Sequence, residues 1–337
     1  MVSIFYNQNQ GRWQGWILIL IVVLSAAGCA PRINLFPDGT DPLKAFVIEG
    51  KAPQKIVMIP VHGFISDRPE KGILTGGPSM VQEIVSQLRV AERDENVKAI
   101  LLKIDSPGGT ITASDMLYKE IMNFKERTGV KVVAVLMGVA ASGGYYLALA
   151  ADHIIAHPTT ITGSVGVIFL HPGISGLMEK IGLDMQVSKS GKNKDMGSPF
   201  RTATQEEKEM LRHLIDHFGG RFVDLAAARR KLDLNQVAEI RTARIFTAGQ
   251  ALDLDLIDQI GYLADAVNQA KSVAELPSDS QLILYRRTEH PDDNLYNSAT
   301  SRRTDIPPSL FHLNLPGSLN RFRTGFYYLW PAAAGDR

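Results

Sequence analysis

Residues 131–151 read KVVAVLMGVAASGGYYLALAA, and this stretch decides the fold class. KVVAVLMG (131–138) has the apolar, β-branched composition of a buried strand, and YYLALAA (145–151) is an apolar, helix-like run. Ser142 stands between the two, followed directly by two glycines. A strand that passes into a helix through so short a joint is typical of βαβ units, which build parallel sheets.

Two more strand–helix pairs precede this stretch. KIVMIPVHGFI (55–65) and KAILLKID (98–105) have strand composition, and apolar residues recur at near-helical spacing within 76–97. The segment 113–129 reads as a helix that Gly129 closes. We therefore predict an α/β fold with a mainly parallel sheet, right-handed crossovers and surrounding helices.

Downstream of the joint the pattern becomes mostly helical. We expect a helix near 173–181, a short strand-like piece at DMQVSKS (184–190) and a long helix over 202–232. Thr204 with Glu207 three residues later predicts a capping box at the start of the long helix. Gly219-Gly220 is a candidate break or kink in it. Two further short helices are expected within 242–274.

The N-terminus carries an export signal. Residues 16–30, WILILIVVLSAAGCA, hold no charge, but fifteen residues are short for a membrane span, which needs about 20. They suit the apolar core of a secretory signal, and the chain's single cysteine, Cys29, ends the sequence AAGC. AAGC resembles the lipobox of bacterial lipoproteins, where the cysteine is lipidated. The alternative is an uncleaved anchor in which Cys29 is incidental. Either one tethers the protein to a membrane, facing away from the cytoplasm.

Composition shifts set the expected domain boundaries. Residues 1–30 form the signal or anchor, and the proline-containing residues 31–53 form a linker. Residues 54–275 form the main domain, and 276–337 a more polar C-terminal extension. The aromatic and basic part of this extension, 315–330, could dock on the body, on a neighbouring copy or on a membrane surface.

The charge balance argues against several functions. Lys and Arg number 36 against 35 Asp and Glu, whereas a dedicated nucleic-acid binder is expected to be strongly basic. The sequence contains no Walker-type loop and no GxGxxG, so no nucleotide cofactor is expected. His213 and His217 lie one helical turn apart, but HLIDH lacks the glutamate of HExxH. We interpret the pair as a solvated helix face and expect no metal.

Three glycine-bearing joints are candidate parts of a catalytic site. In DSPGGT (105–110), glycines allow backbone N–H groups to turn outward and hold an oxyanion. In MGVAASGGYY (137–146), Ser142 stands at a helix start as a candidate nucleophile. TGSVGV (162–167) places glycines around another serine. Each has a plain alternative: a turn for the first and third, and a helix N-cap for Ser142.

A nucleophilic serine needs a base, and the eight histidines offer no obvious one. A lysine can act instead if its amine is neutral, which requires burial or a positive neighbour. The irregular segment SKSGKNKDMGSPFR (188–201) offers Lys189, Lys192 and Lys194. The plain alternative for each is an exposed loop charge.

These motifs, in this order, resemble the signal peptide peptidase A family (S49) of Ser–Lys serine peptidases over roughly 55–275. The resemblance implies a ClpP/crotonase-like fold, with Ser142 as nucleophile, Lys194 as general base and Ser164 as the residue that orients the lysine. It further implies that Gly109 and Gly143 donate the oxyanion N–H groups, with Gly108 in support. Asp105 stands where the family often has asparagine, which leaves its local role open.

The resemblance also implies partners and location. It implies peptide hydrolysis without metal or cofactor, acting on remnant signal peptides and other unfolded apolar segments. Single-length members of the family form homo-oligomers, and an octamer is expected here, so that Lys194 can act on Ser142 of a neighbouring copy. The expected location is the bacterial cell envelope, with the catalytic domain outside the cytoplasm. The alternatives are a crotonase-like acyl-CoA enzyme and a catalytically silent scaffold of the same fold.

Overall fold

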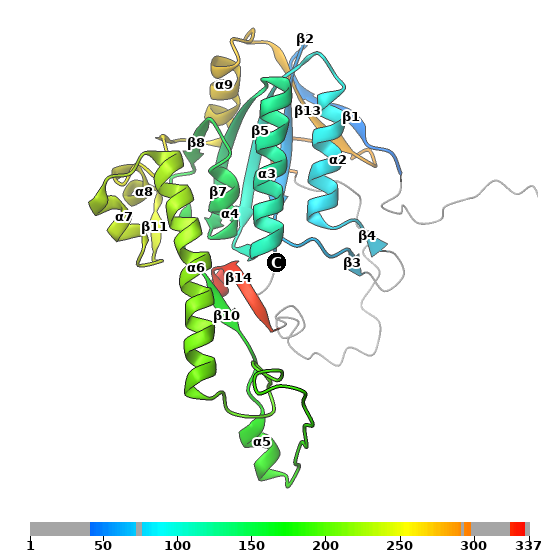
Figure 1. Ribbon diagram of the computed structural model, residues 1–337. Coiled ribbons are helices and arrows are strands. Elements are labelled where there is room, and N and C mark those ends of the chain that lie inside the picture. Colours follow the sequence, from blue (N-terminus) through cyan, green and yellow to red (C-terminus); the bar gives the residue numbers. More distant parts are fainter. Residues whose placement is uncertain (1–40, 72–75, 291–292, 298–323, 334–337) are drawn as a thin grey trace, which may run out of the picture. The chain divides into compact units, whose positions relative to one another are not determined.

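The computed structural model describes residues 41–71, 76–290, 293–297 and 324–333 (Figure 1). Its central sheet follows the order β1-β13-β2-β5-β7-β8-β12; β9 also pairs with β7, and β11 pairs with β9. The members are β1 (Lys44–Glu49), β2 (Ala52–His62), β5 (Val97–Ser106), β7 (Lys131–Ala141), β8 (His153–Ala156), β9 (Ile161–Gly163), β11 (Ile245–Thr247), β12 (Gln259–Ile260) and β13 (Ser280–Arg286). The pairs from β13 through β2, β5, β7 and β8 to β12 are all parallel, which confirms the predicted α/β class.

Side chains alternate between the two faces of this sheet, as the strand period requires. On β2, Val57, Ile59 and Val61 belong to the core under one set of helices, and Ile56 and Met58 to the core under another. The first set is α2 (Met80–Glu92), α3 (Ile111–Thr128), α4 (Gly143–Ala148) and α6 (Gln205–Arg230); the second face is covered by α9 (Leu263–Val273). Figure 1 shows α2 and α3 covering one face of the sheet.

The remaining elements are short. They are β3 (Glu70–Lys71), β4 (Gly76–Gly77), β6 (Gly108–Thr110), β10 (Ile168–Leu170), β14 (Gly325–Leu329), α5 (Ser175–Lys180), α7 (Leu234–Ile240) and α8 (Ala248–Asp253). β10, β14 and β6 form a separate three-stranded antiparallel sheet. This small sheet joins a late segment of the chain to the DSPGGT joint.

Several helix predictions are confirmed. Thr204 caps α6, with its side chain accepting the Glu207 N–H and the Glu207 side chain returning to the Thr204 N–H. α6 runs without interruption through Gly219-Gly220, so these glycines do not break the helix.

The strand expected at 184–190 is absent, and those residues form an exposed irregular segment. With no neighbouring strand to accept its backbone hydrogen bonds, the apolar content of the segment does not suffice.

The expected domain boundaries need correction. The linker predicted for 31–53 contains β1 and the start of β2, and the extension predicted for 276–337 contains β13 and β14. β1 pairs with β13, and β13 pairs with β2, so both segments complete the central sheet. The described residues form one compact unit. The predicted signal segment with Cys29 lies outside the described residues.

Candidate active site

Ser142 occupies the junction between the central sheet and α4, a short helix whose residues are all buried. β7 ends at Ala141 and α4 begins at Gly143, so Ser142 must turn the chain within one residue. It does so with φ 52° and ψ −116°, a left-handed conformation that costs energy for any residue with a Cβ. Its N–H donates to the Gly163 carbonyl at 2.8 Å, and its carbonyl accepts the Tyr146 N–H at 2.8 Å.

The hydroxyl of Ser142 is the unusual feature of this junction. The residue is fully buried, yet its Oγ has no hydrogen-bond partner among the described residues. The side chain makes no capping bond to α4, so the simple N-cap interpretation is wrong. A buried hydroxyl left unpaired is expensive, and groups of this kind are often retained for catalysis.

The DSPGGT joint packs directly against this turn. Gly108 has φ 102°, and a Cβ added to it would come 2.7 Å from the Gly143 nitrogen. A Cβ on Gly143 would come 3.1 Å from the Gly109 nitrogen. Glycine is therefore required on both sides, and it brings the main chains of β6 and α4 together at Ser142.

Ser106 fixes this joint, a role that the sequence analysis missed. It is fully buried, donates its hydroxyl to the Gly63 carbonyl at 2.6 Å and accepts the Gly108 N–H at 3.1 Å. Gly108 thus contributes through its backbone conformation, since its N–H is already bonded. The serine of an SPGG turn is the signal that could have indicated the brace.

Ser164 lies beside Ser142. β9 pairs with β7 so that Gly163 faces Ala141, and the two serines are the residues that follow this pair. Ser164 also has a positive φ of 53°, is 9% exposed and donates its N–H to the Arg244 carbonyl at 2.8 Å. Two neighbouring serines in left-handed backbone, both packed inside the protein, form a concentrated site of strain.

Asp105 has a structural role at this end of the sheet. The register of β5 against β7 shifts between Ile104 and Ser106, and there the Asp105 carboxylate accepts the Val139 N–H at 3.1 Å. Its other oxygen lies 3.4 Å from His62 Nδ1. The carboxylate thus satisfies a backbone group that the irregular ladder would leave unpaired.

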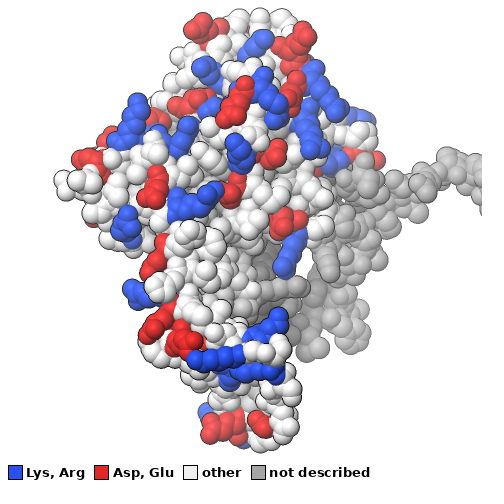
Figure 2. Space-filling view, in the orientation of Figure 1, with Lys and Arg blue, Asp and Glu red and all other residues white. Residues whose placement is uncertain are grey.

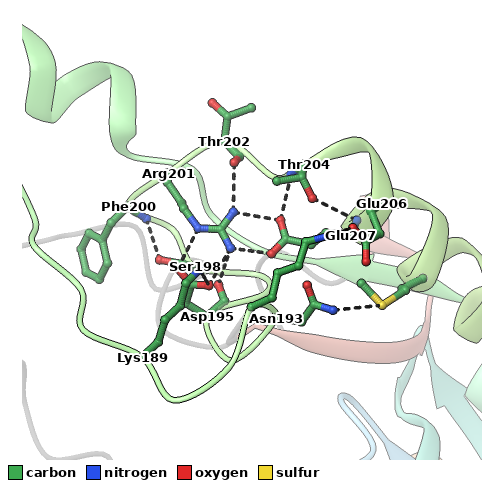
Figure 3. Close-up of polar contacts among 12 residues, drawn as sticks. Lys189, Asn193, Asp195, Ser198, Phe200, Arg201, Thr202, Thr204, Glu206 and Glu207 are labelled. Atoms are coloured by element: carbon green, nitrogen blue, oxygen red, sulfur yellow. Dashed lines mark hydrogen bonds and ion pairs between the residues drawn. The ribbon is translucent and has the colours of Figure 1, made fainter.

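Lys194 lies in another part of the chain. It is exposed, in a turned segment that joins α5 to α6, and its N–H donates to the Gly191 carbonyl at 3.1 Å. Among the described residues its amine has no hydrogen bond or ion pair. By contrast, Lys189 pairs with Asp195 (Figure 3), and Lys192 pairs with Glu206. Within one chain, therefore, no hydrogen bond joins Lys194 to Ser142.

Aromatic side chains cover the helix that Ser142 starts. Tyr146 of α4 stacks on Tyr328 of β14 at 5.1 Å between ring centroids, and both contact Phe222 of α6. Tyr146 also donates its hydroxyl to Asp115 at 2.6 Å, and burial together with this bond raises the pKa of its phenol. Of the three partners considered for the aromatic tail, the body is the one that its described part, β14, contacts, with Tyr328 opposite Gly109 of β6.

A charged patch, a metal cluster or a membrane-spanning helix among the described residues would indicate another kind of site. Acidic and basic side chains are interspersed over the face shown in Figure 2, as the balanced composition predicts. In the described part of the chain, no three His, Cys, Asp or Glu side chains gather in a metal-binding cluster. Nor does any helix described here have the length and hydropathy to cross a bilayer.

A mainly parallel sheet with a strained, buried serine at the end of a strand, packed against a short strand that contains two glycines, defines a serine peptidase of the ClpP-like fold class. The Clp protease family model matches residues 76–162. The model of peptidase family S49 matches residues 124–277, and the chain belongs to this family.

Individual relatives agree with this assignment. The chain is 36% identical over 238 residues to a protein of Enterococcus faecium described as a candidate signal peptide peptidase SppA, covering 71% of this chain and 69% of that one. It is 38% identical over 226 residues to a candidate protease of Synechocystis, covering 67% and 76%. Protease 4 of Haemophilus influenzae is 30% identical over 243 residues, covering 72% of this chain and 38% of that longer one.

Proposed function

We propose that this serine peptidase works with a Ser142–Lys194 dyad on unfolded, apolar peptide segments such as remnant signal peptides. The observation that carries the proposal is the buried Ser142 hydroxyl, held at a strained backbone position with no hydrogen-bond partner among the described residues. A nucleophile must be free to meet its base and its substrate, and this hydroxyl makes no capping hydrogen bond to α4.

The proposed reaction is acyl transfer. Neutral Lys194 takes the proton of the Ser142 hydroxyl while Oγ attacks the peptide carbonyl, and the N–H groups of Gly109 and Gly143 hold the resulting oxyanion. As the C–N bond breaks, the lysine returns the proton to the leaving amine. Water, deprotonated by the same lysine, then hydrolyses the ester and frees Ser142. Ser164, the neighbour of Ser142 at this joint, is proposed to orient the amine.

The dyad is proposed to form between copies of the chain. The exposed position of Lys194 and the partnerless Ser142 hydroxyl both support a lysine supplied by a neighbour in a homo-oligomer, for which an octamer is proposed. The apolar residues 16–30 and Cys29 support a lipidated or anchored form that holds the enzyme at the membrane of the bacterial envelope, beside its substrates.

The test is hydrolysis of casein and of a synthetic signal peptide, with fluorophosphonate labelling of the active serine. We expect Ser142→Ala and Lys194→Ala each to reduce kcat by about 10⁴-fold or more, and Ser142→Ala to abolish labelling. Lys194→Arg should be equally inactive, because an arginine cannot become neutral. Mixing the two alanine variants should restore partial activity if the dyad forms between copies.

Two results would overturn this proposal. Near-normal cleavage by Ser142→Ala would remove the serine from catalysis, and near-normal cleavage by Lys194→Arg would remove the lysine. A wild-type protein that neither cleaves nor labels would favour the catalytically silent scaffold.

A further inference from the structure

The segment that carries Lys194 is held by an ion-pair network. Arg201 donates from Nε and Nη2 to the Asp195 carboxylate, both at 2.8 Å, and from Nη1 and Nη2 to the Glu207 carboxylate at 2.8 and 2.5 Å. Lys189 adds a third donor to Asp195 at 2.6 Å. Figure 3 shows the guanidinium lying between the two carboxylates, with all its polar edges in use.

This network is anchored on a rigid element. Glu207 is 1% exposed and also accepts the Thr204 N–H at 2.8 Å, so the same carboxylate closes the capping box of α6. At the other end of α6, Phe222 is fully buried in the main core. Because α6 is a continuous helix, a position fixed at Glu207 is fixed relative to the body of the protein.

The network ends on the residue next to Lys194. Asp195 directly follows it, and the backbone around the pair is closed by turns, with Met196 N–H donating to Asn193 at 3.1 Å and Ser198 N–H to Asp195 at 3.0 Å. The Asp195 side chain is 13% exposed and points into the network, whereas Lys194 is exposed. The turn thus separates two consecutive charged side chains, one held inside and one presented outward.

Every carboxylate of this segment is already paired with a cation. Residues 189–207 contain four cations and three carboxylates. Asp195, Glu206 and Glu207 are all bonded to Lys189, Lys192 or Arg201. Among the described residues Lys194 is the cation of this set that has no carboxylate partner. The amine of Lys194 is therefore not held in an ion pair within this segment and stays available to another partner.

We propose that Arg201, together with Asp195 and Glu207, positions Lys194 for catalysis and keeps its amine free of carboxylates. The three are positioning residues, since none is proposed to touch the substrate, and the inference rests on the proposed role of Lys194. Reacting groups misplaced by about 1 Å can lose about 10²-fold in rate, which sets the scale of the expected effect.

The experiment measures kcat, KM and the pH dependence of kcat for peptide hydrolysis, with the thermal midpoint as the measure of folding. Arg201→Gln should lower kcat by about 10²-fold with KM nearly unchanged. The pH at which kcat is half-maximal should also differ from that of the wild type, because a displaced lysine loses its contact with Ser142. Arg201→Lys should restore only part of kcat, because an ammonium cannot form paired bonds to two carboxylates.

Two further variants keep the test decisive. Asp195→Asn preserves the shape of the turn and should lower kcat in the same way as Arg201→Gln. It provides the test if Arg201→Gln fails to fold. Glu206→Gln is the matched control, since it breaks the neighbouring exposed pair with Lys192 and should leave kcat and its pH dependence unchanged.

The outcomes separate this inference from the dyad itself. If Lys194→Ala is inactive while Arg201→Gln and Asp195→Asn keep wild-type kcat and pH dependence, the network only stabilises the fold and the positioning role is wrong. If Lys194→Ala is active, the dyad is wrong instead.

Discussion

The junction at Ser142 and the segment around Lys194 are built by different forces. The first is made of main chain: glycines let β6 approach α4 beside a fully buried serine. The second is made of side chains, with carboxylates and cations clamping an exposed turn. The Ser142 junction should therefore be intolerant of added atoms, and the Lys194 segment sensitive to changes of charge.

The largest effect should come from adding one methyl group to the junction. In Gly109→Ala the new Cβ would lie under 3.0 Å from the main chain of Ile65, which the parallel pairing of these residues holds in place. We expect the free energy of unfolding, measured by urea denaturation, to fall by about 3 kcal/mol, since overpacking usually costs about 1–3 kcal/mol. We also expect kcat for peptide hydrolysis to fall at least 10²-fold, because the loss of an oxyanion donor, the role proposed for the Gly109 N–H, usually costs about 10²–10³ in rate. Wild-type stability in this variant would mean that the main-chain contact is not rigid.

Low pH should destabilise the segment around Lys194 more than the junction at Ser142. Hydrogen bonds from Arg201 hold the pKa of Glu207 near 2, and those from Arg201 and Lys189 hold the pKa of Asp195 below its usual range. Both carboxylates stabilise the fold above their ordinary pKa values of 4.5 and 3.8, and this stabilisation is lost as the pH falls from there toward 2. Hydrogen exchange, corrected for its intrinsic pH dependence, should show lower protection in 189–207 at pH 2.5 than at pH 6. Equal loss across 131–148 would contradict the contrast.

A smaller effect should follow from removing one hydroxyl beside the junction. Tyr146→Phe deletes the 2.6 Å bond to Asp115 but keeps the ring against Tyr328 and Phe222. Asp115 retains its pair with Arg221, so the cost should be about 1–2 kcal/mol, seen as a lower urea midpoint with an unchanged slope. A cost above about 4 kcal/mol would show that the hydroxyl supports more of the site than this bond.

The smallest effect should be a gain. Gly220 lies inside α6, and a Cβ added there would meet nothing within 4 Å. Gly220→Ala should therefore raise the free energy of unfolding by about 0.5–1 kcal/mol without changing kcat, because alanine loses less backbone entropy on folding. A destabilised variant would indicate that the open side of this helix turn is covered by another copy.

Local signals in the sequence predict one region better than the other. Strand composition, glycine pairs and the Thr204–Glu207 capping box are encoded within a few residues, and the structure confirms the strands and the cap. The Asp195–Arg201–Glu207 network escaped prediction because it joins charges in an irregular segment, where spacing does not indicate which ones meet. β1, β13 and β14 escaped it for a related reason: each pairs with a distant segment, and its own composition resembles a linker or tail.

The pairing of β14 with β6 has a consequence during protein synthesis. β14 begins 183 residues after Ser142, so β6 lacks this neighbour in a nascent chain until long after the serine has been translated. At about 5–20 residues per second, the interval is roughly 10 to 40 s. During that time a chain emerging from the ribosome contains the serine, but β6 still lacks the strand that pairs with it. The order of translation therefore delays completion of the peptidase site proposed at Ser142 until most of the protein around it has been made.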